Sequence, residues 1–528
     1  MKIFDSVAQM KLATIKAGQY VETFGYYTKG DAGAARYLVV ASQAADGYGD
    51  HVLANGTVAV LQSSGTVNVK QVGAVGDDVA DDSDAIIKAI ELSYATVRKL
   101  FIPAGTYKVT KTISANISNL EITGAGTDVT IIKATGVFKT CLEVNNGSWD
   151  DSTDTYSLSG SSIGSVTMSG FTLDGTASTG CTGLVLARAT LGCVANRVKI
   201  IDFSAGMRNY GSWYSKYNQV ILENNDINQH IGYESNDMTF SGCDWISDPA
   251  NQSSMHIDTA ITGTCRNVNF LGCGFDGVPT IAGMRMRGIH NLNFRDCYLE
   301  VYNSEVTKTA NFIELGLETI GVVIDGCNLI TGTGYSGTWV KCGIANGDAG
   351  KNITFGTNFQ LNGGTNTCTV IDTEFSLAVS LGNSRTERPI SITNPAEIIP
   401  SAMISTFIPA TTGLDEITVP ISTVRKKYTI PVTRIKVVFL ESGTTLTTQK
   451  LRVINDANSV LVNWELPNII TAGDTHYITD DSFSLYETVT GEPAINSVME
   501  SGDSLRAYTY KVGTGWPFPA MSIYVEMT

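Results

Sequence analysis

Carboxylates that recur every two to three dozen residues are the side chains best suited to chemistry in this sequence. Asp244, Asp276 and Glu300 end or interrupt three similar stretches, CDWI, CGFD and CYLE. Glycoside hydrolysis uses two carboxyl groups, about 5 Å apart for retention or roughly 6.5–9.5 Å apart for inversion, and one must be protonated. The three acids can act together only if the fold brings distant parts of the chain close to one another.

An irregular repeat around these acids predicts how they are brought together. Alternating stretches with apolar first and third residues begin at residues 166, 198, 220, 238, 268, 292 and 322, and each precedes a two-residue corner and a second strand. The predicted first residues of the second strand are Phe171, Phe203, Asn225, Cys243, Cys273, Cys297 and Cys327. A third strand follows in MHID (255), MRMR (284), FIELG (312), WVKCG (339) and CTV (368).

Three short strands per turn of the chain predict an all-β, right-handed parallel β-helix. Equivalent positions of successive turns then stack about 4.8 Å apart. Asp276 and Glu300 are predicted to be direct neighbours, and Asp244 to lie about 8 Å from Asp276. Tyr298 and Tyr302 would be platforms for sugar rings, although acids on this face also serve simply to solvate the helix.

The third strand carries a second group of candidate residues. Its predicted outward positions are His256, Arg285, Glu314, Lys341 and Thr369, with Asp258 beside Arg287. Alternating charge favours ion pairing between strands. As a site, this face would bind an acidic sugar through Arg285, Arg287 and Lys341, with Glu314 or His256 transferring protons, as a polysaccharide lyase requires.

Aromatic residues and cysteines complete the middle of the chain. Tyr214 and Tyr217, in GSWYSKYNQ, are candidates for stacking on a glycan, whereas Trp245 is expected in the core. The four cysteines that share one position are expected to be buried, apolar thiols without a redox role. No CxxC pair occurs, so we expect no structural zinc.

Five aspartates lie between Asp77 and Asp84, in VGDDVADDSDAIIKAI. A calcium site is one interpretation. We favour turns and the N-terminus of a helix with an apolar face of Ile86, Ile87 and Ile90, because the open end of a β-helix needs a cap. No metal and no cofactor are therefore expected.

Composition sets the wider limits. The chain has 528 residues with a net charge of −15, which disfavours nucleic acid as a partner. Neither a signal peptide nor a membrane span is expected.

All ten cysteines lie between Cys141 and Cys368, and ten of the thirteen prolines lie from Pro389 onward. These breaks predict an N-terminal segment (1–70), the β-helix (71–385) and a C-terminal antiparallel β-sandwich (386–528), whose strands include RIKVVFL and MSIYVEM. The string GDSL at Gly502–Leu505 is not taken as an esterase motif, because no histidine follows it.

The beginning of the chain resembles a known family. VGAVGDDVADDSDAIIKAI followed by KLFIPAGTYKVTKTI (to Ile113) resembles the opening motif of pectate-lyase-like β-helix proteins, particularly bacteriophage tailspikes. IKAGQYVETFGYYTKGDAGAARYLVV (Ile15 to Val40) resembles the neck of tailspikes from capsule-infecting phages. The motifs span roughly residues 5–135, and the repeat continues to about residue 380.

This resemblance implies a homotrimeric receptor-binding spike of the virion tail, made in the host cytoplasm and acting at the bacterial surface. It would be attached to the phage tail or another tail protein through the N-terminus, and its C-terminal module would trimerise or bind carbohydrate. Little precedes the neck, so a head-binding domain is expected to have been trimmed or replaced by a short adaptor. The predicted function is depolymerisation of a capsular or O-antigen polysaccharide through a carboxylate pair. A lyase on the same fold and a non-catalytic adhesin are the alternatives.

Overall fold

A computed structural model describes residues 1–331, apart from 64, 96–97, 147, 151–154, 158–160, 233, 248–254, 260–263, 278–281, 302–310 and 317–318, and beyond residue 331 it describes the strands. The chain divides into two units. Residues 1–353 form the bulk of the first, and residues 395–528 form the bulk of the second.

The first unit begins with a small sheet. Its strands are β1 (Lys2–Phe4), β2 (Tyr20–Thr23), β3 (Ala35–Val40), β4 (Asp50–Val52) and β5 (Val58–Leu61), in the order β1-β2-β3-β5-β4, with the helix α1 (Val7–Lys11) after β1. Val21, Tyr37 and Val39 are completely buried and form its core. The Tyr27 hydroxyl donates a 2.8 Å hydrogen bond to the Gly73 carbonyl, which ties this sheet to the segment that opens the β-helix.

Helix α2 (Ser83–Ala95) caps the β-helix. Ile86, Ala89 and Ile90 on its apolar face are buried, and the helix contacts β6 (Val67–Asn68), β8 (Lys99–Ile102) and β10 (Ile113–Ser114), the first strands of the coil. Ile87, predicted on the same face, is only half-buried. The apolar stripe thus covers the open end of the coil, as the sequence predicts.

The five aspartates hold the turns that lead into this helix. Asp82 is buried and accepts hydrogen bonds from the backbone N–H groups of Val75 (2.6 Å) and Gly76 (3.0 Å). Asp77 caps the turn that follows it, and Asp81 accepts hydrogen bonds from Ser83 and Thr110. Asp78 and Asp84 form ion pairs with lysines. The interpretation as turn residues is confirmed, and Asp81 accepts the backbone N–H group of Ser83, the first residue of α2.

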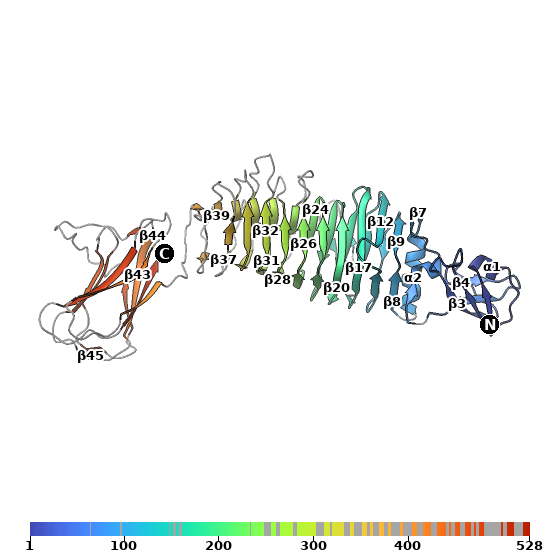
Figure 1. The fold of residues 1–528 in the computed structure, drawn as a ribbon, viewed down its shortest axis with the longest axis horizontal. Coiled ribbons are helices and arrows are strands. Elements are labelled where there is room, and N and C mark those ends of the chain that lie inside the picture. The colour runs from blue at the N-terminus through green and yellow to red at the C-terminus, as the bar shows by residue number, and fades with distance from the viewer. Residues whose placement is uncertain are drawn as a thin grey trace. The chain divides into compact units, whose positions relative to one another are not determined.

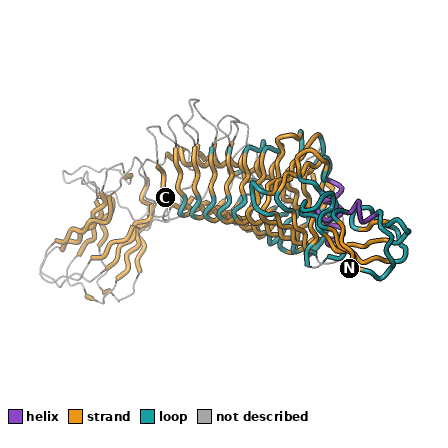
Figure 2. Tube along the Cα trace, turned by 45° about the vertical axis from the view of Figure 1, so that its right-hand side comes forward, coloured by secondary structure: helices purple, strands orange, loops and turns teal. Residues whose placement is uncertain are grey.

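The rest of the first unit is a parallel β-helix with three strands per turn (Figures 1 and 2). We call its three sides faces 1, 2 and 3. Around the candidate acids, face 1 is built from β25 (Asn236–Ser241), β28 (Cys265–Leu271), β31 (Ile289–Arg295) and β34 (Ile320–Asp325). Face 2 is built from β23 (Ile221–Glu223), β26 (Asp244–Ile246), β29 (Gly274–Asp276), β32 (Tyr298–Val301) and β35 (Asn328–Thr331). Face 3 is built from β21 (Ala205–Tyr210), β24 (Ile227–Gly232), β27 (Met255–Thr259), β30 (Ala282–Met286), β33 (Asn311–Leu315), β36 (Thr338–Cys342) and β39 (Thr369–Thr373).

The corner between faces 1 and 2 has the same length in successive turns. Two residues connect β25 to β26, β28 to β29, β31 to β32 and β34 to β35. The first of them has a positive φ in each turn: Gly242 (55°), Gly272 (58°), Asp296 (53°) and Gly326 (66°). Glycine and aspartate tolerate this left-handed conformation, which turns the chain sharply without loss of register.

Aromatic rings fill the interior in stacks. Phe240, Phe270 and Phe294 stack with ring centroids 5.0 and 4.9 Å apart, and Trp245 stacks on Phe275 at 4.7 Å. Trp245 is fully buried, as predicted. Such stacks fix the register, since each turn must place a ring over its neighbour.

The predicted cysteine column is confirmed. Cys243, Cys273, Cys297 and Cys327 are all buried and free, and their thiols contact backbone carbonyls of the preceding turn, such as that from Cys297 Sγ to the Phe270 oxygen at 3.4 Å. Burial raises the pKa of two further thiols, Cys193 and Cys265, to about 11, which keeps them protonated.

Two of the predicted alignments are wrong. Ile200 and Leu222 are in register with Trp245 on face 2, one strand later than predicted. In those two turns, the inward residues of face 1 are Ala195 and Tyr217. Phe203 and Asn225 therefore do not belong to the cysteine column, which Val198 and Val220 extend. The alignment failed because each of these turns contains two similar apolar stretches, and the stretch on face 2 was assigned to face 1.

The second unit contains antiparallel strands. One sheet has the order β42 (Ile404–Ile408), β52 (Met521–Met527), β44 (Ile430–Phe439), β49 (Thr475–Thr479), with β50 (Val498–Met499) paired to β44. The other has the order β43 (Glu416–Thr423), β51 (Ser504–Lys511), β46 (Gln449–Ile454), β47 (Val460–Glu465). In the part of the chain that the structure describes, no helix has the length and apolarity needed to cross a membrane.

Candidate functional site

Three carboxylates lie together on face 2, in the register that the sequence predicts. Asp276 on β29 is directly opposite Glu300 on β32. Asp244 on β26 is opposite Gly274, two residues before Asp276 on the same neighbouring strand. The backbones of Asp276 and Glu300 are therefore about 4.8 Å apart, and those of Asp244 and Asp276 about 8 Å apart.

Asp244 occupies a distinct environment within this group. The residue opposite it is glycine, and a Cβ atom at Gly274 would lie only 2.5 Å from Asp244 Oδ1. The carboxyl group thus leans across Gly274, toward the turn that carries Asp276. Asp244 is half-buried, and this burial raises the pKa of its carboxyl group. Asp244 is consequently suited to carry the proton that glycoside hydrolysis needs.

Glu300 is held by a neighbouring phenol. The Tyr298 hydroxyl donates a 2.9 Å hydrogen bond to Glu300 Oε2. Burial, followed by the interaction with Glu300, raises the pKa of Tyr298 to about 12, so the phenol remains a donor. The ring of Tyr298 is 39% exposed, which leaves it accessible as a platform beside the acids.

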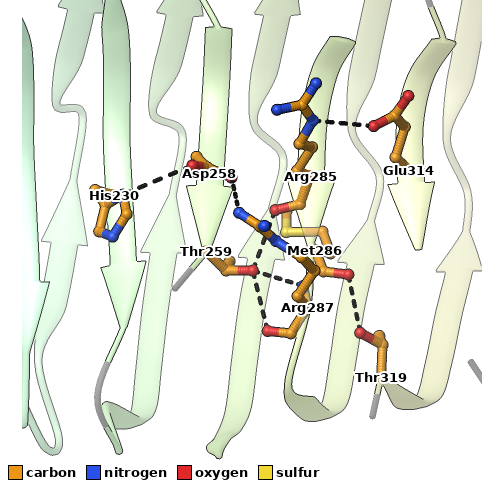
Figure 3. A network of polar contacts seen from close by, with 8 residues as sticks. All are labelled: His230, Asp258, Thr259, Arg285, Met286, Arg287, Glu314 and Thr319. Carbon is orange, nitrogen blue, oxygen red and sulfur yellow. Dashed lines mark hydrogen bonds and ion pairs between the residues drawn. The ribbon is translucent and has the colours of Figure 1, made fainter. Parts of the chain in front are cut away.

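Face 3 carries a ladder of ion pairs (Figure 3). Arg285 Nε lies 3.1 Å from Glu314 Oε2, and Arg287 Nη2 lies 2.6 Å from Asp258 Oδ1. Asn311 also donates to Glu314. Glu314 is 7% exposed. The charged groups thus satisfy one another, in agreement with the predicted pairing between strands.

The predicted composition of this ladder requires correction. Arg285 is in register with Asp258, not with His256, and the preceding position is His230. His256 is fully buried, with Nε2 2.7 Å from the Gly277 carbonyl, so it cannot contact a polymer as predicted. The prediction failed because the connections from face 2 to face 3 differ in length from turn to turn, so the spacing along the chain does not fix the register of β27.

The end of the ladder differs as well. Lys341 is in register with Glu314, as predicted, and its side chain lies outside the described residues. The next position is Asp372, whereas the predicted Thr369 pairs with Thr338. The predicted proximity of Asp258 and Arg287 is confirmed by their ion pair, whereas His230 was missed as a ladder member.

The tyrosines predicted to bind glycan have different locations. Tyr217 is completely buried, stacks on Phe240 at 4.4 Å and accepts a hydrogen bond from Asn209, so it belongs to the core and this prediction is wrong. Tyr214 is 58% exposed in the turn before β22 (Lys216–Asn218), far along the chain from face 2 acids. Tyr302 lies outside the described residues.

Metal ligands are not clustered in the described part of the chain, where no group of three or more His, Cys, Asp or Glu side chains could hold an ion. The face 2 acids lie on three successive strands of one face, with Asp276 opposite Glu300 and Asp244 opposite Gly274.

The coil and its cap form a parallel β-helix. Residues 66–301 match the family model described as rhamnogalacturonase A/epimerase, pectate lyase-like. The predicted fold class is thereby confirmed. A short segment of 76 residues, 12% of this chain, is 42% identical to the mannuronan C5-epimerase AlgE2 of Azotobacter vinelandii, of which it spans only 7%.

Solved structures of similar fold include phage proteins. The tailspike protein gp49 of the Acinetobacter baumannii bacteriophage Fri1, a capsular polysaccharide depolymerase, has a TM-score of 0.51 at 14% identity, with 100% of this chain and 98% of that chain covered. The ORF18 protein of Geobacillus virus E2 has a TM-score of 0.51 at 18% identity, with 78% of this chain and 80% of that chain covered. The fold is shared with both.

Proposed function

We propose that this protein is a phage tailspike that binds and depolymerises a bacterial capsular or O-antigen polysaccharide by hydrolysis on face 2. The observation that carries the proposal is the register that brings Asp244, Asp276 and Glu300 together on successive turns. The shared fold of the Fri1 tailspike over the whole chain supports the same function.

Asp244 and Asp276 are the proposed acid and base. Their backbones lie about 8 Å apart, and a separation of roughly 6.5–9.5 Å between their carboxyl groups would suit an inverting glycosidase, in which a water molecule lies between the base and the sugar. Burial raises the pKa of the Asp244 carboxyl group, which is the direction that a general acid requires. Glu300, hydrogen-bonded to Tyr298, lies beside Asp276 and orients the water or the substrate.

A lyase on face 3 is less well supported. Such an enzyme needs a free basic group to neutralise a uronate and another to remove its C5 proton. Arg285 and Arg287 are already paired with Glu314 and Asp258. Burial lowers the pKa of His230 to about 3, and this imidazole is 5% exposed. Neither group is available to a polymer without rearrangement of the ladder.

The remaining parts of the chain have proposed roles in the particle. The small N-terminal sheet would attach the spike to the phage tail or to another tail protein. The antiparallel unit from residue 395 would trimerise the chain or bind carbohydrate. Location in the virion tail and a homotrimeric state belong to the same proposal.

Cleavage by carboxylate variants tests the proposed site. Asp276→Asn and Asp244→Asn are each expected to lower the rate of capsule cleavage by roughly 10²–10⁴-fold, because each removes a proton-transfer group. Reducing ends would be counted after incubation with capsules from a panel of strains, and absorbance of an unsaturated sugar would reveal a lyase instead.

The matched control is Asp174→Asn. Asp174 lies on face 2 in the same outward column, four turns before Asp276, so its loss should leave the rate unchanged. Normal cleavage by both site variants would place the chemistry elsewhere. Binding of capsule without any change in polymer size would identify an adhesin.

A further inference from the structure

Face 2 is unusually poor in positive charge around the candidate acids. Its strands from β23 to β35 contain no lysine or arginine. Four outward positions in this stretch are acidic, namely Glu223, Asp244, Asp276 and Glu300. The surface on which a polymer would lie is therefore negative over several consecutive turns.

Basic residues at the borders of this surface are either engaged or located on another face. Lys199 precedes the stretch, in register with Ile221, and its ammonium group lies 3.0 Å from Glu223 and 3.9 Å from Asp128. Arg295 ends β31 on face 1, where its neighbours in register are Leu271 and Asp325. Neither points to a site for an anionic sugar on face 2 within the described residues.

The accessible group that remains beside the acids is an aromatic ring. Tyr298 is partly exposed, and its hydroxyl is already bonded to Glu300. A phenol ring held in this way offers a flat apolar surface to the C–H groups of a sugar and no charge to a carboxylate. The half-exposed Ile246, in register between Glu223 and Asp276, adds a second apolar side chain.

We infer that the sugar units on both sides of the cleaved bond are uncharged, either neutral hexoses or N-acetylated amino sugars. A uronate or phosphate at these positions would lie close to two or three carboxylates, with no lysine or arginine on the described face 2 strands from β23 to β35 to offset them. The inference rests on the proposed function and specifies its substrate class. An acidic sugar elsewhere in the repeating unit remains compatible with it.

Analysis of the cleavage products tests this inference. Mass spectrometry of oligosaccharides released from a cleaved capsule is expected to find an uncharged sugar at each new reducing and non-reducing end. A uronate at either end would overturn the inference while leaving depolymerase activity, and hence the proposed function, intact.

Chemical neutralisation of the substrate provides a second measurement. Carbodiimide activation and borohydride reduction convert the uronates of the same capsule to neutral hexoses. We expect kcat/KM to stay within threefold of its original value or to rise. A loss of more than tenfold would show that a carboxylate of the polymer is recognised at the site, and would overturn the inference.

A binding measurement tests this inference even if the protein does not cleave the polymer. On an array of uncharged and uronate-containing oligosaccharides, the wild-type protein is expected to bind uncharged ligands, and Asp276→Asn is expected to strengthen binding of uronate ligands by removing a negative charge. Wild-type binding of a ligand made only of uronates, if Asp276→Asn does not strengthen it, would overturn the inference even if no polymer is cleaved.

Discussion

Tyr298 is the residue at which two roles can be separated. Its ring was predicted as a stacking platform, and the structure adds a hydroxyl bonded to Glu300. A hydrogen bond to a charged group contributes roughly 1.5–3 kcal/mol. The hydroxyl and the ring can be removed one at a time, so each role has its own variant.

Tyr298→Phe is expected to lower kcat by about tenfold with little change in KM, because Glu300 loses its donor while the ring remains. Tyr298→Ala should in addition raise KM, since the surface for the sugar is lost. Steady-state kinetics on one purified capsule would measure both. A raised KM in the phenylalanine variant, with kcat unchanged, would contradict the positioning role.

At the scale of single elements, helix α2 depends on one buried carboxylate. Asp82 accepts two backbone N–H groups, whereas Asp84 forms an exposed ion pair with Lys111. The two aspartates are close in sequence and identical in type. Their surroundings predict very different contributions to stability.

Asp82→Ala is expected to destabilise the first unit by roughly 2–4 kcal/mol, because two backbone donors lose their acceptor in a buried site. Asp84→Ala should cost less than about 1 kcal/mol, as is typical of exposed ion pairs. Thermal unfolding followed by circular dichroism would compare them. Similar melting temperatures for the two variants would contradict the assigned role of Asp82.

The sequence pattern predicted the positions of the strands more accurately than it predicted the register between successive turns. From Cys243 to Cys327, the two-residue corner is constant and carries a single apolar stretch before it, so the positions of Asp244, Asp276 and Glu300 followed from the spacing. Around Ile200 the turns contain two similar stretches, and the alignment slipped by one strand.

Face 3 was harder to predict for a related reason. The chain between faces 2 and 3 changes length from turn to turn, so the start of a strand says little about its register. His256 was consequently placed outward, although it lies under the corner beside Phe275 and Phe312. Hydrogen bonds such as that from Tyr298 to Glu300 depend on rotamers and are not encoded in spacing at all.

At the scale of the whole molecule, three buried histidines make stability dependent on pH. Burial lowers the pKa of His51 and His256 to about 4 and that of His230 to about 3 in the folded chain. The unfolded chain, with histidine pKa values near 6.5, binds more protons below that pH. The free energy of unfolding contributed by these groups is therefore complete above pH 6.5 and falls as the pH approaches 4.

We expect the melting temperature of the first unit to decrease steadily between pH 6.5 and pH 4. His256→Gln would reduce this dependence, because one of the three titrating groups is removed, and His290→Gln is the control, since His290 is half-exposed on β31. Differential scanning calorimetry at a series of pH values would measure the effect. A dependence that is identical in both variants would contradict the contribution of His256.

The two kinds of corner have unequal freedom to change. Two residues join face 1 to face 2 in each of the four turns from β25 to β35. By contrast, eight residues separate Ile246 from Met255, five separate Asp276 from Ala282, and nine separate Val301 from Asn311. Each of these longer connections leaves face 2 directly after a carboxylate strand. Insertions and deletions there can alter which glycan is recognised while the reacting groups keep their spacing. Under the proposed function, changes in these connections would adapt the protein to an altered host polysaccharide while the carboxylates keep their positions on face 2.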